Sequence, residues 1–417
     1  MTVNPNTLVR IFIAIFLVTI SVLAFQVYQH AVFLQDQRKQ LIHDYYDANV
    51  DDNVSYDLMI EEDLHKRKIR RSKISKMKSN IRRINLKQRV YNAEFLYGIT
   101  NVTYIIVIQV HNDVYLFKQL LDSLRTAHSI ASALLIFSHD VFETKMNQAV
   151  HTVNFARYMQ IFYPYSIQLH PFVYPGVAYA SDDKENTEKS KERDPVAAQK
   201  KLHWWWQVNQ VFDNLSVTKN YTKTILFLQE NDYVTEDFLI VLKLLEHVRG
   251  AHCPVCEIIS LGAHSPEPGN YLNRTAVVAL EIWAKNLPNI GIAFNRDIWH
   301  IIKGWSRDFC DFNDYTWENS LKYVGSQHMD INFYFTDIIA SRVFRIECGK
   351  ENPRCDLKRK LDDVKSFTQV IRHSLYPAIL MLRIVKGKDY SVDALGSFQD
   401  ERDRELCMYF TKNCVWY

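Results

Sequence analysis

Short apolar runs that end in clusters of polar side chains constrain the fold of this chain more than any other feature. Residues 104–110, 133–137, 158–163 and 225–228 have the length and composition of buried strands. A stretch whose apolar residues share one helical face, from Leu116 to Leu124, follows the first run. Because strands that alternate with helices form βαβ units, the sequence predicts an α/β protein with a largely parallel sheet.

Three of these runs stop abruptly in polar residues. The clusters are residues 111–113, residues 138–140, and the four residues Gln229, Glu230, Asn231 and Asp232. Ligands of open α/β sheets bind beyond the carboxyl ends of the strands, so we expect the clusters to converge on one edge as a nucleotide-type site. The acids of the last cluster make it a candidate metal or phosphate-ester site. The alternative is a solvated turn in which Asp or Asn caps the next helix.

Length and composition limit the classes of protein to consider. A chain of 417 residues allows one large or two ordinary domains. Its 47% hydrophobic and 23% charged residues fit a folded globular protein, and a net charge of +3 does not dictate a partner. With 11 glycines and neither GxGxxG nor GxxxxGK[ST], a glycine-rich phosphate loop is disfavoured.

The N-terminus carries a nearly unbroken apolar run, residues 11–27, preceded by Arg10. It is slightly shorter than the roughly 20 residues of a typical membrane span. A cleavable signal peptide is the alternative, but the run ends in bulky residues with no small-x-small cleavage site. We therefore predict a single-pass type II membrane protein with a cytoplasmic tail (1–10) and a transmembrane signal anchor (11–28).

Residues 29–97 are polar and change the sign of their charge midway, from acidic at 47–63 to basic at 66–89. Within the basic part, Ile74, Met77, Ile81 and Ile84 recur at helical spacing, which predicts a solvated helical stem. Residues 98–417 then form a lumenal catalytic domain. This location argues against a nucleic-acid partner despite the basic stretch.

Several residue patterns agree with a lumenal body. The N-x-[ST] sequons lie at Asn53, Asn101, Asn214, Asn220 and Asn273. Seven cysteines in this compartment favour disulfides, for which we expect the pairs Cys253–Cys256, Cys348–Cys355 and Cys310–Cys407. A four-cysteine zinc site is the alternative, but the spacing of the second pair does not match it.

Two further segments carry expectations. Residues 181–194 are highly charged and predict an exposed loop. Trp204, Trp205 and Trp206 are adjacent, so we expect that they cannot all face one core. At least one would then line a cleft wall, where it could stack on a sugar or base; pure core packing is the alternative.

An ordered series of segments carries a family resemblance. The series comprises residues 109–112, 120–125, 136–140, 165–169, 203–206, 253–256, 260–262 and 314–317. From about Val90 to Cys407 the chain resembles the alpha-1,6-mannosyl-glycoprotein 2-beta-N-acetylglucosaminyltransferase (N-acetylglucosaminyltransferase II) family. The resemblance implies a GT-A glycosyltransferase fold, with a Rossmann-like nucleotide-sugar domain, in the Golgi lumen.

The resemblance also implies a reaction and its partners. The family transfers N-acetylglucosamine from UDP-GlcNAc, with inversion and with Mn²⁺, to the 2-hydroxyl of the α1,6-arm mannose of N-glycans. The implied partners are UDP-GlcNAc, a glycoprotein acceptor and the Golgi membrane. A homodimer is a further hypothesis. This chemistry requires a carboxylate base, a held uridine and neutralisation of the leaving diphosphate.

Site residues follow from the matched positions. Glu318 stands where the family has its catalytic Asp. The donor-binding positions are Gln109, His111, Asn112, Asp113, Asp140, Gln199, Lys201, His203 and Glu230. Asp113 replaces an arginine of the family, which removes a donor to the phosphates.

The metal-binding positions differ from the family at both ligands. The family's metal-binding Asp and His are here Asn231, a weak Mn²⁺ ligand, and Arg345, which cannot bind a metal. Three hypotheses follow. The enzyme is metal-independent and Arg345 pairs with the diphosphate; or Asp232 takes over as the metal ligand; or the chain is a catalytically inactive relative that binds glycans or partner proteins.

Overall fold

The computed structural model describes residues 55–93, 102–177, 193–252, 256–263, 267–282, 290–327, 334–348, 355–384 and 397–412. The chain divides into two compact units, Met1–Lys73 and Ile74–Tyr417. The predicted tail and anchor lie outside the described residues. Within the described residues, no helix combines the length and the apolar composition that a membrane crossing requires. The division into tail, anchor, stem and lumenal domain therefore stays a prediction.

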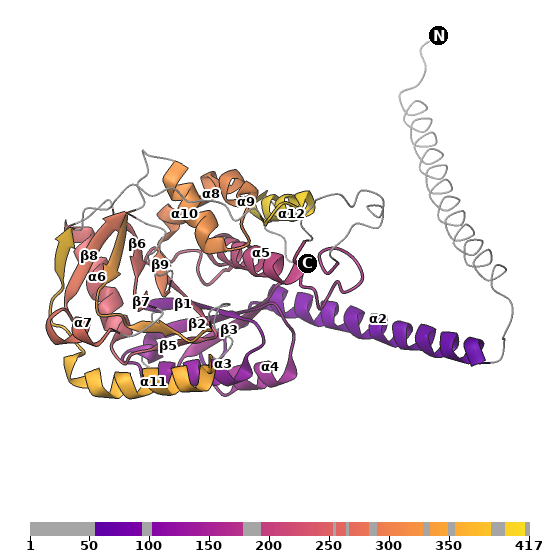
Figure 1. Ribbon diagram of the computed structural model, residues 1–417, viewed down its shortest axis with the longest axis horizontal. Coiled ribbons are helices and arrows are strands. Elements are labelled where there is room, and N and C mark those ends of the chain that lie inside the picture. The colour runs from indigo at the N-terminus through magenta and orange to yellow at the C-terminus, as the bar shows by residue number, and fades with distance from the viewer. Residues whose placement is uncertain are drawn as a thin grey trace, which may run out of the picture. The chain divides into compact units, whose positions relative to one another are not determined.

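The second unit is built on a mixed β-sheet (Figure 1). In the part of the chain that the structure describes, it has nine strands in the order β12-β8-β10-β6-β9-β4-β1-β2-β3. Their bounds are β1 Tyr104–Val110, β2 Ala133–His139, β3 Arg157–Phe162, β4 Ile225–Gln229, β6 Cys256–Ser260, β8 Val277–Ile282, β9 Ile292–Phe294, β10 Tyr334–Ile338 and β12 Met381–Ile384. A smaller sheet joins β5 (Asp232–Val234), β11 (Val343–Arg345) and β7 (Gly262–Ala263).

The predicted α/β class is confirmed, and the predicted parallel strands are found in one half of the sheet. Strands β3, β2, β1 and β4 are neighbours and run parallel. Beyond β4 the sheet is mixed, because β9 runs antiparallel to both β4 and β6, and β8 runs antiparallel to β10. The carboxyl ends of β1, β2 and β4 therefore meet at one edge.

Helices cover both faces of the sheet (Figure 1). One face packs against α3 (Val114–Thr126), α4 (Thr144–His151) and α6 (Phe238–His252). The other packs against α5 (Pro195–Asn209), η3 (Gln210–Asn214), α8 (Arg296–Gly304), α9 (Ser306–Asp311), α10 (Trp317–Gln327) and α12 (Glu401–Lys412). The remaining helices are α2 (Ser55–Lys87), η1 (Ile130–Ser132), α7 (Pro268–Asn273), α11 (Leu357–Val370) and η4 (Ile371–Ser374).

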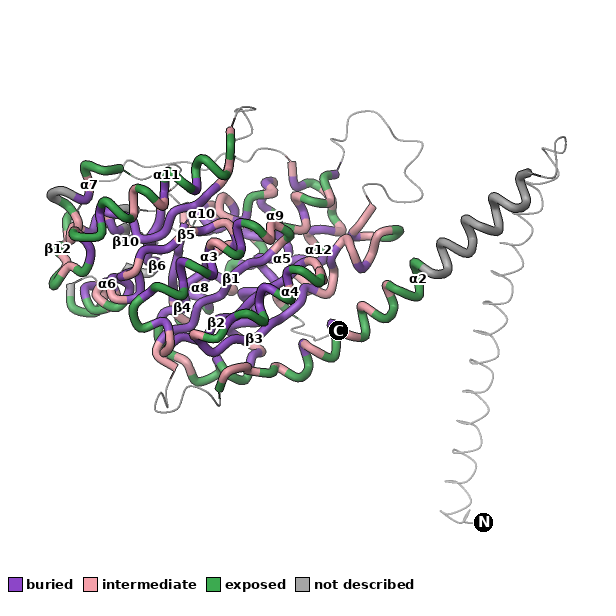
Figure 2. Tube along the Cα trace, turned by 90° about the horizontal axis from the view of Figure 1, so that it is seen from below, coloured by how far each residue is buried: buried purple, intermediate pink, exposed green. Residues whose placement is uncertain are grey.

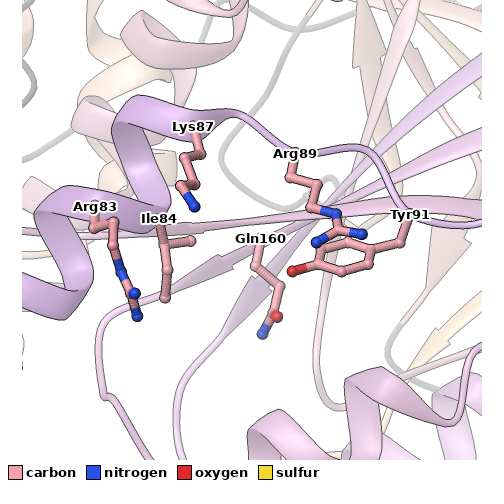
Figure 3. A pocket seen from close by; sticks show the side chains of 6 residues that line it. All are labelled: Arg83, Ile84, Lys87, Arg89, Tyr91 and Gln160. Carbon is pink, nitrogen blue, oxygen red and sulfur yellow. The ribbon is translucent and has the colours of Figure 1, made fainter.

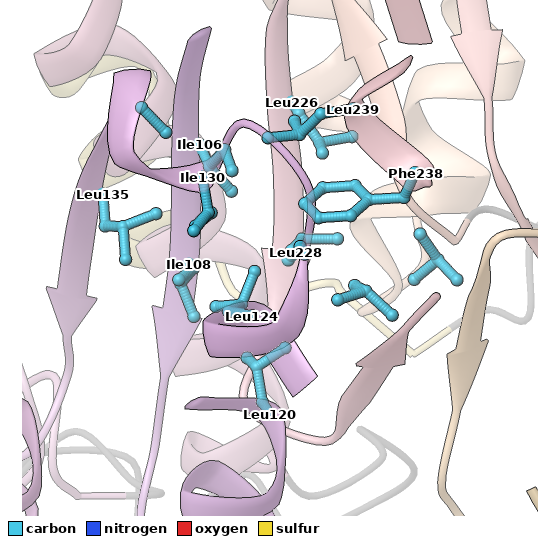
Figure 4. Close-up of a cluster of buried hydrophobic side chains, with 14 of the residues drawn as sticks. Ile106, Ile108, Leu120, Leu124, Ile130, Leu135, Leu226, Leu228, Phe238 and Leu239 are labelled. Carbon is cyan, nitrogen blue, oxygen red and sulfur yellow. The ribbon is translucent and has the colours of Figure 1, made fainter. Parts of the chain in front are cut away.

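The alternation of side chains along β1 explains why the sheet is buried on both sides. Ile105 and Val107 belong to the core beneath α5, whereas Ile106 and Ile108 belong to the core beneath α3. Figure 4 shows the second core, and Figure 2 shows continuous burial along the central strands and α5. Burying each of these aliphatic side chains contributes roughly 1.5–3 kcal/mol, so both layers are needed to hold β1.

The expectation for the three tryptophans is wrong. Trp204, Trp205 and Trp206 are all buried, with at most 1% of each side chain exposed. Helix α5 has the sheet on one side and α9, α10 and α12 on the other, so residues 201–209 are buried all round. Trp204 accordingly stacks on Trp317 of α10, with ring centroids 4.2 Å apart.

The end of the predicted stem is helical, as expected, but it is not fully solvated. Ile81 of α2 packs against Phe162 and Leu169. Asn85 is completely buried, and its side chain exchanges two 2.8 Å hydrogen bonds with the backbone of Phe162. This last part of α2 lies within the second compact unit, because its apolar residues face strand β3 rather than water.

Two of the predicted disulfides are present. Cys310–Cys407 joins α9 to α12, and Cys348–Cys355 closes a short loop before α11. The predicted pair Cys253–Cys256 and most of the predicted loop 181–194 lie outside the described residues. The loop's end is not exposed throughout, because Arg193 is buried and donates two 2.7 Å hydrogen bonds to Asp403 of α12.

Candidate functional site

The polar clusters after β1, β2 and β4 meet as the sequence predicts. Gln109 lies opposite Ser138 of β2 and Gln229 of β4 in the strand register. The α5 residues Gln199 and His203 approach the same edge from the covering helix, where Gln109 contacts His203. The edge thus combines side chains from three strands and one helix.

His111 and Asp140 form an ion pair at this edge. The His111 Nδ1 atom lies 2.6 Å from Asp140 Oδ2, which also accepts a 3.0 Å hydrogen bond from Gln199. Burial opposes the charged form of each group, but their mutual attraction prevails. It raises the pKa of His111 above its usual value and holds the pKa of Asp140 at about 2. The pair is therefore charged over the acidic range, and Asp140 Oδ1 stays buried without a partner.

His203 is fully buried behind this pair. Its Nε2 lies 2.8 Å from Ser138 Oγ, and its Nδ1 lies 3.4 Å from Gln109 Nε2. Burial lowers the pKa of His203 to about 3, so the imidazole is neutral. The ligand atoms of His111, Asp140 and His203 lie within 4.8 Å of one another, a spacing that could hold a metal ion. His111 Nδ1 and both ring nitrogens of His203 are nevertheless already engaged in hydrogen bonds.

Glu230 organises the loop after β1. Its carboxylate accepts hydrogen bonds from the backbone N–H groups of His111 (2.7 Å), Asn112 (3.2 Å) and Asp113 (3.0 Å). Burial raises the pKa of Glu230. The side chain of Asp113 in turn caps α3 by accepting from Leu116 N at 2.9 Å. Glu230 and Asp113 thus shape the loop that presents His111 and exposed Asn112.

Arg345 and Asp232 face one another across the small sheet. They are direct partners in the antiparallel register of β11 and β5. Arg345 donates from Nε to Asp232 Oδ1 at 2.8 Å and from Nη2 to Oδ2 at 3.2 Å. Oδ2 also accepts from the backbone N–H of Gln229 at 2.8 Å. Both carboxylate oxygens of Asp232 are therefore occupied.

The residues at this place do not fit a divalent cation. Asn231 turns its amide Nδ2 toward the carbonyl of Ile346, at 3.1 Å. Glu230 is committed to three backbone N–H groups and Asp232 to the Arg345 guanidinium. Hard divalent cations require free carboxylate or carbonyl oxygens, and a guanidinium in their midst repels them. The hypothesis that Asp232 replaces the missing metal ligand is therefore not supported by its geometry.

Glu318 occupies the first turn of α10, close to Arg345. Its neighbour Trp317 anchors this turn by stacking on Trp204. Burial raises the pKa of Glu318, while the positive charges of Arg345 and of Lys322 one turn later oppose that rise. A half-buried carboxylate with a raised pKa is a stronger proton acceptor than a free one.

Lys201 is the predicted donor-binding residue that the structure does not bring to the edge. It is completely buried, and its Nζ donates 2.9 Å hydrogen bonds to the carbonyls of Phe312 and Asp314. The ammonium also lies 3.9 Å from the ring centroid of Phe398. On α5, Lys201 faces α9 and the segment before α10, away from His203. Its role is to fix that segment, and the prediction of donor contact is corrected.

Two contributors to the site were missed from the sequence. Ser138, which contacts His203, lies at the end of β2 in the polar cluster 138–140 and could have been found there. Lys322 lies one helical turn after Glu318, at the i,i+4 spacing that brings side chains together. Trp204 also lines a small cavity of about 10 Å³ with Gln109 and Arg345, room for at most one water.

Comparisons with known proteins decide the family. Residues 78–407 match the family model of N-acetylglucosaminyltransferase II (MGAT2). The chain belongs to this family. The match begins within α2, which agrees with the packing of Ile81 and Asn85 on the sheet. All of the predicted site residues lie inside the matched range.

Relatives in the N-acetylglucosaminyltransferase II family come from animals and plants. Each is named alpha-1,6-mannosyl-glycoprotein 2-beta-N-acetylglucosaminyltransferase. The Homo sapiens protein is 29% identical over 339 residues, covering 74% of this chain and 73% of its own length. The Sus scrofa protein is 28% identical over 358 residues (80% and 79%), and that of Arabidopsis thaliana is 28% identical over 325 residues (73% and 74%).

Two solved structures show a distant likeness. Staphylococcus aureus TarS (residues 1–349) has a TM-score of 0.34 and 8% identity, covering 75% of this chain and 71% of its own. Mouse xyloside xylosyltransferase 1 has a TM-score of 0.31 and 12% identity, covering 56% of this chain and 83% of its own.

Proposed function

We propose that this chain transfers N-acetylglucosamine from UDP-GlcNAc to the 2-hydroxyl of the α1,6-arm mannose of N-glycans. Transfer proceeds with inversion, in the synthesis of hybrid and complex glycans. The observation that carries the proposal is the family match over residues 78–407. The names of the relatives specify the sugar, the linked hydroxyl and the mannose arm.

The donor binds at the sheet edge, in the manner of a GT-A glycosyltransferase. The parallel order β3-β2-β1-β4 supports this placement, since nucleotides bind beyond the carboxyl ends of such strands. The unpartnered Asp140 Oδ1 would accept a hydrogen bond from the uracil N–H or a ribose hydroxyl. His111, held by the other oxygen of Asp140, is positioned to donate to the same nucleoside.

Glu318 is the catalytic base. The acceptor hydroxyl passes its proton to the Glu318 carboxylate while its oxygen bonds to C1 of the sugar. The bond from C1 to the diphosphate breaks on the opposite face, which inverts C1 and releases UDP. The raised pKa of Glu318 supports this role, because a base accepts a proton best when its pKa approaches the working pH.

Arg345 neutralises the leaving diphosphate, and the enzyme works without a metal. A guanidinium matches two phosphate oxygens at once and carries a permanent positive charge. Asp232 holds the Arg345 guanidinium in place from one side, next to the turn that carries Glu318. The altered residues Asn231 and Arg345 are thus compatible with catalysis.

The chain acts in the Golgi lumen, anchored through residues 11–28 as a type II membrane protein. The apolar run at 11–27 and the sequons after it support this placement. The acceptor glycan meets the enzyme in that compartment.

The test uses the full chain, solubilised in detergent, with UDP-GlcNAc and a trimannosyl glycan whose other arm already carries N-acetylglucosamine. Parallel reactions contain EDTA or Mn²⁺, and the product linkage is determined by NMR. We expect equal product in both. Product only with Mn²⁺ would overturn the metal-free step and keep the transferase. No product in either reaction, with UDP still bound, would overturn the transferase and favour a glycan-binding role.

A further inference from the structure

A recess of about 180 Å³ lies where the last turns of α2 meet strand β3. It is lined by three cationic side chains and three neutral ones, namely Arg83, Lys87, Arg89, Ile84, Tyr91 and Gln160. In Figure 3, Lys87 and Arg89 flank Gln160, and Arg83 extends from the preceding turn of the helix on the same side. The recess is separate from the sheet edge that holds His111 and Asp140.

The backbone around the recess is fixed by buried contacts. Asn85 is bonded on both sides to the backbone of Phe162. Tyr91 and Tyr158 exchange backbone hydrogen bonds of 2.8 and 3.3 Å. Asn92 donates to the carbonyls of Val153 and Ala156 at 2.8 and 2.9 Å. The two segments that carry the cations are therefore held against β3 at both ends.

The three cations have no acidic partner among the residues that the structure describes. None of the ion pairs among the described residues involves Arg83, Lys87 or Arg89. Instead, the Arg89 guanidinium lies over the Tyr91 ring, 4.9 Å from its centroid. Tyr91 in turn stacks on Tyr158, also at 4.9 Å. The aromatic pair orients Arg89, and its N–H donors meet no carboxylate in the described part of the chain.

The helix terminus alone does not explain this grouping. A helix C-terminus favours cations only within its last turn, which accounts for Lys87. Arg83 precedes that turn and Arg89 follows the helix, so neither gains that benefit. An anion in the recess would give all three a negatively charged partner.

We propose that this recess binds a tetrahedral oxyanion, a phosphate or sulfate monoester group. Two guanidinium forks and one ammonium supply several N–H donors to its oxygens, and arginine geometry matches such groups in particular. A monoester carries up to two negative charges, which balances these cations better than a single carboxylate does. Gln160, 7% exposed, also lines the recess and adds no charge, while its amide Nε2 contacts His139 and Asn147.

The test is titration calorimetry on the full chain with inorganic phosphate and inorganic sulfate. Saturating UDP is present throughout, so that the donor site is filled. The double variant R83Q/K87Q removes two of the cations. The matched control K76Q/R82Q removes the same charge from positions of α2 that are exposed like Arg83 and Lys87 but lie outside the recess. We expect saturable binding in the wild type and the control, and a loss of about tenfold or more in affinity in R83Q/K87Q.

Two organic probes distinguish the sources of the group. Mannose 6-phosphate stands for a phosphorylated glycan, and glycerophosphoinositol 4-phosphate stands for a lipid headgroup. If one of these probes binds more tightly than inorganic phosphate, its class is the natural ligand. If both bind with the affinity of inorganic phosphate, the ligand is the free anion. Equal affinity in R83Q/K87Q and K76Q/R82Q, or no saturable binding by any probe, overturns the proposal. Urea unfolding of both variants separates this outcome from a folding defect.

Discussion

Arg345 and Asp232 form a buried ion pair across strands β11 and β5, close to Glu318. The guanidinium meets both carboxylate oxygens, at 2.8 and 3.2 Å, and at most 6% of either side chain is exposed. Because Asp232 balances the Arg345 charge, the guanidinium acts on a ligand chiefly through N–H donors, which suit an anion and cannot bind a cation. The pair therefore links the stability of the small sheet to the chemistry proposed for the site.

The change Asp232→Asn tests how much the Arg345–Asp232 ion pair contributes to stability. It leaves the buried guanidinium without its counter-charge, and breaking such a pair costs about 3–5 kcal/mol. In urea unfolding, the free energy of unfolding should fall by an amount in that range. The control Asp311→Asn breaks the exposed pair Arg307–Asp311, whose side chains are 86% and 51% exposed. It should cost less than about 1 kcal/mol, and equal losses would contradict the role assigned to burial.

The change Glu318→Gln tests the base. The amide keeps the size of the side chain but cannot take a proton, so kcat should fall by about 10²–10⁴-fold. Affinity for UDP, measured by calorimetry, should stay within about threefold, since no proton transfer is involved in binding. Activity retained at wild-type level would show that another group is the base.

Lys322→Gln provides a pH test of the same carboxylate. The positive charge of Lys322 opposes the rise of the Glu318 pKa, so its removal raises that pKa further. Because the base must be ionised, activity is lost as the pH falls through its pKa. The acid limb of kcat against pH should therefore move to higher pH in Lys322→Gln. A shift to lower pH would exclude Glu318 as the titrating group.

Local sequence patterns predict the half of the sheet that contains β1, β2, β3 and β4. Strands β1, β2, β3 and β4 lie within a few residues of the expected ranges, because fully buried strands are unbroken apolar runs. The meeting of His111 with Asp140 follows from the same topology. Local pattern does not reveal that β9 enters antiparallel between β4 and β6, since a three-residue strand has too little sequence to specify direction.

The errors have a common physical origin in long-range packing. Trp204, Trp205 and Trp206 are all buried because α9, α10 and α12 cover the outer face of α5, and those helices are distant in sequence. Lys201 is withdrawn from the edge by carbonyls more than 100 residues away. The Arg345–Asp232 pair likewise depends on a strand register across 113 residues, which no local motif encodes.

Lys201 makes a prediction for stability against pH. Burial lowers the pKa of Lys201 from 10.5 to about 7, so between these values the unfolded chain binds more protons at this site than the folded chain. The Lys201 contribution to the free energy of unfolding then rises with pH, by about 1.4 kcal/mol per pH unit at most. The free energy of unfolding is measured for the wild type and for Lys201→Met between pH 7 and 10. The difference between the two proteins should rise with this slope. A flat difference would contradict the lowered pKa.

The two disulfides should differ in their contribution to stability. Cys310–Cys407 closes a segment with a sequence separation of 97, against 7 for Cys348–Cys355. In the chain-entropy description, the longer loop constrains the unfolded chain more, by about 4–5 kcal/mol against about 2 kcal/mol. The double variant C310A/C407A should therefore lose more stability than C348A/C355A under non-reducing conditions in urea. It should also loosen α12 from α9, next to the carbonyls that hold Lys201. Faster amide exchange at 312–314 in C310A/C407A alone would show this, and equal effects of the two variants would contradict the entropic account.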